Sequence, residues 1–386
     1  MERDLRLDFF RGLALFCIFL DHLPNNIVSQ FTLQSLMLSD AAEVFILISG
    51  YTAGMVYGRA MERQGFLAAG ARVYHRLWQL YVAHVFVFMI FMATVSYAVG
   101  ALNQWLYAEE WFGATDFLNE PGLALVQALM LQFQPGFMGI LPLYIVLLAV
   151  LPLVLAGFRS WSGVMLFASF ALWLAVQFDN RVALPAYPGP DRVWVFNPLA
   201  WQALFLLGAW FGWRNIESGV SWLNRRWLLW LAAGLSLAGF LIRFNWTLHD
   251  SYDPIPVLVS AKPLWPLLSK TDLGLLRVAS VLAAALLVAR LIRPEARFLA
   301  SQAAWPFLIC GRNSLHIFCL GILLAVLGNL LLTEFFGGIP MQFAVSAAGV
   351  AIMIGVAAFM EWFGAAQGTR GGGAVGAPTA SRGARG

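Results

Sequence analysis

Charged residues are scarce in this sequence, at 11% of its 386 positions, and lysine occurs only at Lys262 and Lys270. A soluble domain carries about a quarter charged residues, so too few remain here to cover a water-exposed surface. Hydrophobic residues make up 60% of the chain, and the mean hydropathy is +0.74. This composition indicates an integral membrane protein. It excludes a secreted disulfide scaffold, a disordered chain and a nucleic-acid-binding protein, although the isoelectric point is near 9.1.

Cysteine is also rare, with three residues that all fall within apolar stretches: Cys17, Cys310 and Cys319. An odd number of cysteines without regular spacing predicts neither a disulfide framework nor a metal site. We therefore expect these thiols to fill contacts between helices.

The apolar residues form runs long enough to cross a bilayer, which takes roughly 20 residues. We predict an all-α integral membrane protein with about ten transmembrane helices. The ten runs cover residues 9–27, 41–58, 75–101, 137–157, 161–178, 196–213, 227–246, 275–292, 305–332 and 343–363. A shorter apolar run, at residues 123–133, predicts an interfacial or re-entrant helix.

The arginines indicate which loops face the cytoplasm, because cytoplasmic loops are enriched in Arg and Lys. With the N-terminus inside, the cytoplasmic segments contain Arg3, Arg6, Arg59, Arg63, Arg72, Arg76, Arg159, Arg214, Arg225, Arg226, Arg290, Arg293, Arg297, Arg370, Arg382 and Arg385. The outer segments contain Arg181, Arg192, Lys262 and Lys270. This alternation predicts that both termini are cytoplasmic.

The chain divides into a polytopic membrane domain, residues 1–363, and a tail rich in Gly, Ala and Arg, residues 364–386. The tail has too little apolar surface to offset the entropy cost of ordering, so we expect it to be disordered. No cleavable signal peptide fits the N-terminus, because Arg11 interrupts the apolar region that such a peptide requires.

The predicted outer segments combine acidic and aromatic side chains. Their aromatic and histidine residues are Trp105, Tyr107, Trp111, Tyr187, Trp194, His249, Tyr252 and Trp265. A carbohydrate suits such a surface, because sugar C–H faces stack on aromatic rings and sugar hydroxyls accept and donate hydrogen bonds. The alternative is an aromatic belt at the level of the lipid headgroups.

Ionisable residues interrupt the first apolar run, and such residues inside a membrane are usually functional. In a continuous helix, Arg11 and His22 would lie within roughly 20° of one face and about 16 Å apart along the axis. Asp8 lies on that face near the cytoplasm, and Asp21 precedes His22. The alternatives are a snorkelling Arg11 and a His22 that bonds a neighbour at the helix end.

Other ionisable residues lie in later runs. Arg312 and His316 are four positions apart and would be neighbours on one helix. Arg243 and Arg277 lie near the predicted outer ends of their runs, and Glu43 opens the second run. In each case the alternative is a structural pairing between helices.

Two functions need charged groups at these depths. An acyltransferase would bind a coenzyme A thioester through arginines at the cytoplasmic side, because guanidinium binds phosphate in a bidentate manner. A histidine in the outer half would then act as general base on an acceptor hydroxyl. A transporter of an organic anion or a sugar would instead use Arg and His to bind its substrate or to relay protons.

The spacing from Arg11 to His22 resembles the signature of membrane acyltransferases that O-acylate extracytoplasmic sugars, and AAEVFILISGYTAG resembles the second-helix block of that family. More specifically, four blocks resemble the OpgC family, which succinylates osmoregulated periplasmic glucans. They are DFFRGLALFCIFLDHLPNN, LQFQPGFMGILPLYIVLLAVLPLVL, FNPLAWQALFLLGAWFGW and CGRNSLHIFCLG, and the resemblance extends over about residues 5–363. The resemblance implies that Arg11 is the first-helix arginine and His22 the catalytic histidine.

Motifs of soluble acyl-transfer and metal enzymes are missing from the sequence. It has no GxSxG elbow and no HExxH helix, so we expect neither a serine acyl-enzyme nor a metal. We predict an O-succinyltransferase of the bacterial inner membrane that holds no bound cofactor, takes succinyl-CoA as co-substrate and acts on a periplasmic glucan.

The predicted site has three parts. The catalytic residues are His22, Asp21 and Glu43; the donor-binding residues are Arg11, Arg312 and Asp8; and the substrate-binding residues are Arg243, Arg277 and His316.

Overall fold

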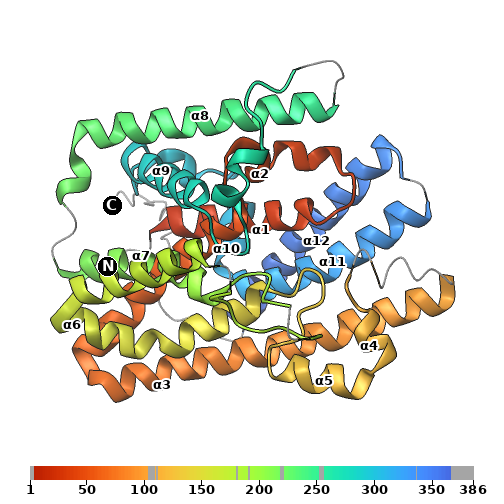
Figure 1. Cartoon of the computed structure of the whole chain (residues 1–386), viewed down its shortest axis with the longest axis horizontal. Coiled ribbons are helices and arrows are strands. Elements are labelled where there is room, and N and C mark those ends of the chain that lie inside the picture. Colours follow the sequence, from red (N-terminus) through yellow and green to blue (C-terminus); the bar gives the residue numbers. More distant parts are fainter. Residues whose placement is uncertain are drawn as a thin grey trace, which may run out of the picture.

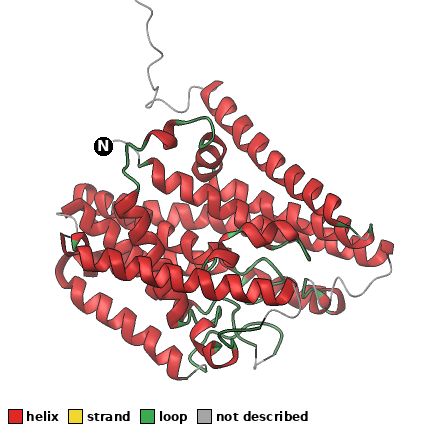
Figure 2. Cartoon of the chain, turned by 90° about the horizontal axis from the view of Figure 1, so that it is seen from above, coloured by secondary structure: helices red, strands yellow, loops and turns green. Residues whose placement is uncertain are grey.

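The computed structural model of the chain describes residues 4–102, 109, 112–179, 181–189, 192–217, 221–251, 256–335 and 337–366. These residues form helices joined by loops, and within them β-pairing is limited to two isolated bridges, Phe133 with Tyr187 and Pro185 with Val193 (Figure 2). The all-α prediction is therefore confirmed for this part of the chain. The predicted aromatic residues Trp105, Tyr107, Trp111 and Tyr252, and the tail from residue 367 onward, lie outside the described residues.

All ten predicted apolar runs are helical, with altered boundaries. The helices are α1 (Leu5–Asp21), α2 (Leu33–Leu36), α3 (Ala41–Leu102), α4 (Thr115–Asn119), α5 (Pro121–Leu129), α6 (Ile140–Phe178), α7 (Pro198–Glu217), α8 (Arg226–Ser251), α9 (Leu275–Leu291), α10 (Trp305–Arg312), α11 (Ser314–Glu334) and α12 (Ile339–Ala366), with a short 3-10 helix, η1 (Ile27–Phe31), after α1. Figure 1 shows their arrangement.

Three of these helical regions contain a break. Both α3 and α6 join two predicted runs across a residue with non-helical backbone angles, Gly65 in α3 and Trp161 in α6. The run at residues 305–332 is divided at Asn313 into α10 and α11. The break at Gly65 matters for function, because it lets the two halves of α3 line different walls of one cavity.

Five helices are long and apolar enough to cross a membrane, judged by length and composition within the described residues. They are Ala41–Leu102, Ile140–Phe178, Arg226–His249, Ser314–Glu334 and Ile339–Ala366. The chain is thus a membrane protein, while the count of ten spans and the cytoplasmic placement of both termini stay predictions.

Glycines bring α3 and α7 into close contact. Gly50 and Gly54 of α3 lie so close to the α7 backbone that a Cβ atom on either would collide with a carbonyl group, and Gly208 and Gly212 of α7 lie equally close to α3. Each pair is separated by three residues, which is the spacing that lets two membrane helices approach closely. This contact fixes the first half of α3, which carries Glu43 and Thr52.

Contacts between distant segments distinguish two ends of the helical body. At one end, Arg6 of α1 donates to the carbonyl oxygen of Ile292, just beyond α9, at 2.9 Å. At the other end, Arg243 of α8 donates to the carbonyl oxygen of Gln34 at 2.7 Å. The predicted topology assigns Arg6 to the inner side and Arg243 to the outer side, and the two ends are named after this prediction. We call them the inner and the outer end.

Candidate functional site

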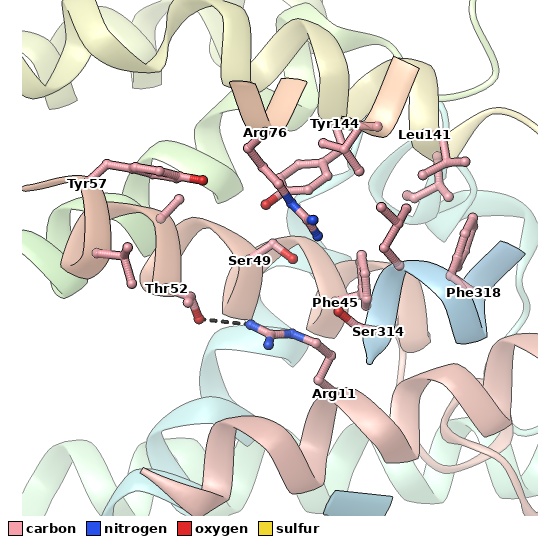
Figure 3. A pocket seen from close by; sticks show the side chains of 15 residues that line it. Arg11, Phe45, Ser49, Thr52, Tyr57, Arg76, Leu141, Tyr144, Ser314 and Phe318 are labelled. Carbon is pink, nitrogen blue, oxygen red and sulfur yellow. Dashed lines mark hydrogen bonds between the residues drawn. The ribbon is translucent and has the colours of Figure 1, made fainter. Parts of the chain in front are cut away.

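A cavity of about 170 Å³ lies between α1, α3, α6 and α11 at the level of Arg11. Figure 3 shows that Arg11 and Arg76 point into it from opposite sides of the view. It is lined by Arg11, Phe45, Ser49, Thr52, Ala53, Val56, Tyr57, Arg76, Leu80, Ile140, Leu141, Tyr144, Ser314, Leu315 and Phe318. We call it the inner cavity.

Arg11 is held in the wall of the inner cavity by two neighbours. Its Nη2 donates to the hydroxyl of Thr52 at 2.9 Å, drawn as a dashed line in Figure 3, and its Nη1 lies 3.9 Å from the carboxylate of Asp8. The Thr52 hydroxyl in turn donates to the carbonyl oxygen of Ile48 at 2.9 Å. The guanidinium is therefore oriented by its surroundings before any ligand arrives.

Asp8 links the predicted donor-binding arginines. The carboxylate is buried, and its second oxygen lies 4.0 Å from Nε of Arg312, while Nη1 of Arg312 lies 3.5 Å from Glu361 of α12. Gly311 makes this arrangement possible, because a Cβ there would collide with the carbonyl group of Asp8. The structure thus brings Asp8, Arg11 and Arg312 together, although Arg312 does not line the inner cavity.

Arg76 is a residue of the inner cavity that sequence reasoning missed. The charge pattern assigned it to a cytoplasmic loop, but it lies in α3 after the break at Gly65 and lines the inner cavity with Arg11. Its Nη1 donates to Gln79 at 3.1 Å, and no carboxylate of the described residues lies within salt-bridge distance of it. A cation in this setting favours an anionic ligand. The position of Arg76 at the start of the third apolar run, residues 75–101, was the feature of the sequence that could have identified it.

His22 ends α1. The helix was expected to continue to residue 27, but it stops at Asp21, because Asn25 has a left-handed backbone conformation and Pro24 lacks the N–H that a helix needs. The prediction that Arg11 and His22 share one helix face assumed a continuous helix, and the helix ends one residue before His22. His22 follows directly as the C-terminal cap, and its backbone carbonyl accepts a hydrogen bond from Asn329 of α11 at 2.7 Å.

The imidazole of His22 has one defined tautomer. Nδ1 lies 2.5 Å from the carbonyl oxygen of Ile18, and a carbonyl can only accept, so Nδ1 carries the hydrogen. In the neutral ring, Nε2 then keeps its lone pair, and among the described residues the ring forms its hydrogen bond through Nδ1 alone. The ring of Phe137 packs against this imidazole in an edge-to-face arrangement. The arrangement suits a general base, which needs an open lone pair on a fixed ring.

Neither predicted catalytic carboxylate contacts the imidazole of His22. Asp21 accepts a hydrogen bond from Thr32 at 2.5 Å, and Glu43 forms an ion pair with Arg277, also at 2.5 Å. The Ile18 carbonyl occupies the orienting position that we expected for one of these acids. The structure therefore pairs both acids with other residues, Asp21 with Thr32 and Glu43 with Arg277.

Four charged side chains form a network at the outer end. Arg277 of α9 bonds Glu43 through Nε and Asp40 through Nη2, the latter at 2.9 Å, and Lys270 lies 2.8 Å from the same Asp40. Burial opposes ionisation of Asp40, yet the positive charges of Lys270 and Arg277 outweigh burial and hold its pKa well below its usual value. Of the two roles considered for Arg277, these contacts match the structural pairing.

A larger cavity, of about 700 Å³, opens beside this network and is called the outer cavity. It is lined by Gln34, Met37, Leu38, Ser39, Asp40, Arg243, Trp246, His249, Val257, Ser260, Ala261, Lys262, Trp265, Leu268, Lys270 and Arg277. Two of the predicted substrate-binding residues, Arg243 and Arg277, therefore meet in one cavity wall.

His316 is the predicted substrate-binding residue that the structure leaves apart. It is exposed on α11 and lines neither cavity. The helix break at Asn313 separates it from Arg312, so the two are not neighbours on one continuous helix. The expectation of a shared face was wrong for this pair.

Comparison with known proteins adds one finding. The family model described as OpgC protein matches residues 3–365, a range that includes both cavities and His22. Neither the curated proteins nor the solved structures gave a match. The family implies an acyltransferase-type function on glucans. By this match over nearly its whole length, the chain belongs to the OpgC family.

Proposed function

We propose that the chain is an O-succinyltransferase of the bacterial inner membrane. It transfers succinyl from succinyl-CoA, which enters from the cytoplasm, to a hydroxyl of a glucan in the periplasm, and both of its termini are cytoplasmic. The observation that carries the proposal is the geometry of His22, whose Nδ1 donates to Ile18 while Nε2 stays open. The family match supports the coarser activity, acyl transfer to glucans.

His22 acts as the general base in this proposal. Its Nε2 takes the proton of the glucan hydroxyl while the oxygen attacks the thioester carbonyl of the donor. The carbon–sulfur bond then breaks, and the departing thiolate receives the proton from the imidazole, so the histidine returns to its neutral form. A positioned base contributes typically about 10² to 10⁴ in rate.

The inner cavity holds part of the donor. Arg11 and Arg76 meet in it, and Arg312 lies behind Asp8 at the same end of α1. At about 170 Å³ the cavity is smaller than the roughly 300 to 1,000 Å³ of pockets for drug-sized ligands. It would therefore bind a phosphate or the thioester arm while the rest of coenzyme A stays at the cytoplasmic face.

The preference for succinyl requires a cation that meets the distal carboxylate of the acyl group, because an unpaired buried charge is costly. Arg243 is our candidate, since it lines the outer cavity and Nε is already oriented by the Gln34 carbonyl. Arg277 is less suited, because its guanidinium bonds Asp40 and Glu43. For His316, a role in substrate binding stays a prediction without a supporting contact.

A reconstituted assay tests the proposal. The purified chain in lipid nanodiscs is given succinyl-CoA and a neutral glucan oligosaccharide, and mass spectrometry measures succinyl esters while a thiol reagent measures released coenzyme A. We expect both products, and we expect His22→Ala to lose both by about 10² or more. His75→Ala is the matched control, because His75 is an exposed histidine of α3 that bonds Gln79.

The outcome that overturns the proposal is equally specific. Uptake of an organic anion into vesicles without release of coenzyme A would identify a transporter, the alternative that intramembrane Arg and His residues raise. Near-normal transfer by His22→Ala would exclude the base role and leave the family-level activity in place.

A further inference from the structure

We infer that Asn329 of α11 is a positioning residue that determines where the imidazole of His22 lies. The inference deepens the proposed function, because it rests on that proposal for the role of His22 as general base. Asn329 is buried within α11, which is one of the helices long and apolar enough to cross a membrane. A polar side chain in such a position is costly unless it forms hydrogen bonds. Asn329 forms them with two backbone carbonyl groups.

Both hydrogens of the Asn329 amide group are used. Nδ2 donates to the carbonyl oxygen of His22 at 2.7 Å and to that of Ala325, one turn earlier in α11, at 2.8 Å. Because a carbonyl oxygen can only accept, these two partners also define which end of the carboxamide carries the nitrogen. The bond to Ala325 ties the amide group to its own helix, so the bond to His22 ties the end of α1 to a fixed point on α11.

The end of α1 needs such partners, because the last carbonyl groups of a helix have no donor within the helix. The carbonyl oxygen of Ile18 accepts from Nδ1 of His22, and that of Leu20 accepts from Asn26 at 3.2 Å. Asn329 supplies the donor for the carbonyl group of His22 itself. The ring of His22 is therefore bonded to α1 and its backbone to α11, so the position of Nε2 depends on both bonds.

Glycines let the three helices meet closely at this level. A Cβ atom on Gly328 of α11 would collide with the side chain of Leu23, and one on Gly349 of α12 would collide with the ring of Phe19. The end of α1 therefore packs directly against α11 and α12. This close approach explains how a side chain as short as that of asparagine reaches the α1 backbone.

The segment that follows His22 has a second anchor, which does not contact His22. The hydroxyl of Ser346 in α12 donates to Oδ1 of Asn26 at 3.3 Å, and Ser346 is buried as Asn329 is. Removal of the Ser346 hydroxyl would loosen the same segment without releasing the carbonyl group of His22. Ser346 is thus a matched control that separates positioning of the base from general anchoring of the segment.

Release of the His22 carbonyl group should act on the chemical step. Without its partner, the end of α1 frays, and the bond from Nδ1 to Ile18 opens for part of the time. The tautomer of a histidine follows the hydrogen bond that one ring nitrogen makes, so Nε2 would no longer be held as the free base. A misplacement of about 1 Å can cost about 10² in rate. The inner cavity, which lies at the level of Arg11, is not affected.

The variant Asn329→Ser removes the bond to His22 alone. A serine hydroxyl in a helix bonds the carbonyl group four residues earlier, here that of Ala325, and it is too short to reach α1. In nanodiscs with succinyl-CoA and a glucan oligosaccharide, we expect kcat to fall by about tenfold to a hundredfold and the KM for succinyl-CoA to stay within about twofold. Asn329→Gln, which keeps the carboxamide, should recover part of the rate. Ser346→Ala should keep kcat within about twofold, and an equal loss of kcat in Ser346→Ala and Asn329→Ser would overturn the inference.

Nuclear magnetic resonance of the histidine ring nitrogens tests the inference without catalysis. The chain has five histidines, and the isotopically labelled signals of His22 are those that disappear in His22→Ala. We expect a protonated Nδ1 and an unprotonated Nε2 in the unmodified chain and in Ser346→Ala. In Asn329→Ser we expect the two nitrogens to give averaged signals, because the tautomers exchange. Unchanged His22 signals in Asn329→Ser would overturn the inference.

This measurement also separates the inference from the proposed function. A chain that transfers no succinyl group, but whose His22 tautomer depends on Asn329, would overturn the proposed function and leave the positioning of the ring by Asn329 intact. A chain that transfers succinyl groups at the same rate with and without the Asn329 carboxamide would overturn the positioning role and leave the proposed function intact.

Discussion

Phe137 packs against the imidazole of His22, with ring centroids 4.4 Å apart and ring planes at 82°. Phe137 lies in the loop before α6 and has a backbone φ of 71°, a left-handed conformation that is rare for a bulky residue. Strain of this kind persists only where the surroundings enforce it. The loop thus holds the phenyl ring of Phe137 against the imidazole of the proposed base. The carbonyl group of Ile18, within α1, orients the same imidazole through its hydrogen bond to Nδ1.

We therefore expect Phe137 to be a positioning residue. Phe137→Ala should lower kcat of succinyl transfer by about tenfold to a hundredfold, because a loosened imidazole loses its alignment with the acceptor hydroxyl. The KM for succinyl-CoA should change little, and Phe137→Tyr, which keeps the ring, should recover most of the rate. A rise in the KM for succinyl-CoA as large as the expected fall in kcat, with kcat itself unchanged, would contradict the positioning role and indicate a role in donor binding.

A second prediction concerns the inner cavity. If Arg11 and Arg76 bind the anionic part of the donor, Arg76→Lys should raise the KM for succinyl-CoA by about tenfold while kcat stays within a factor of two, because lysine keeps the charge but loses the planar fork. Arg72→Lys is the control, since Arg72 is exposed one helical turn earlier in α3. Identical kinetics for the two variants would remove Arg76 from the donor site.

The inner cavity also shows why sequence reasoning found Arg11 but not Arg76. Arg11 interrupts an apolar run, so its cost in a membrane identified it as functional. Arg76 lies at the edge of a run, where the enrichment of arginine in cytoplasmic loops already explained it. Only the break of α3 at Gly65 brings the two together, and a glycine in sequence does not state the angle between the helix halves.

The outer end shows a second limit. The sequence identified Glu43, Arg243 and Arg277 as ionisable residues near one depth, and the structure places all three at the outer end. The sequence could not identify Asp40 and Lys270 as partners of Arg277. Both precede a helix, and residues in loops have no helical periodicity that would predict where their side chains point. The pairing of Arg277 was left open for the same reason.

The glycine contact between α3 and α7 leads to a prediction about stability. Gly54→Val should destabilise the protein by about 1 to 3 kcal/mol or more, because the added side chain collides with the backbone of Ala209. The measurement is the midpoint of thermal unfolding in detergent. Gly234→Ala in α8 is the control, since a Cβ there meets nothing within 4 Å and alanine favours the helix. Equal midpoints for the two variants would contradict the packing role.

Topology supports another prediction, on which the sides assigned to donor and acceptor depend. A cysteine at Lys262 should react with an impermeant thiol reagent added from the periplasmic side, whereas a cysteine at Arg225 should react only after the membrane is opened. Both positions are exposed, and the contacts of their neighbours place them at opposite ends. The reverse labelling pattern would place His22 on the cytoplasmic side of Arg11 and reject the proposed direction of transfer.

The last prediction separates the two arginines of the outer cavity. Arg277 is 12% exposed and bonds both Asp40 and Glu43, and Glu43 is fully buried. Arg277→Met would leave Glu43 as an uncompensated buried charge, which costs about 3 to 5 kcal/mol, so stability should fall and activity with succinyl-, acetyl- and butyryl-CoA should fall equally. The double variant Arg277→Met with Glu43→Gln should recover part of the stability, because the unpaired charge is gone.

Arg243→Met should behave differently. Its guanidinium lies 5.8 Å from the ring centre of Trp246 and faces the outer cavity, so its loss removes a cation from the surface that would meet the acyl carboxylate. We expect succinyl-CoA to lose about tenfold more activity than acetyl-CoA in this variant, since only the succinyl donor carries a distal charge. Equal losses with all three donors would mean that Arg243, like Arg277, only joins the helices, and that the acyl preference is set elsewhere.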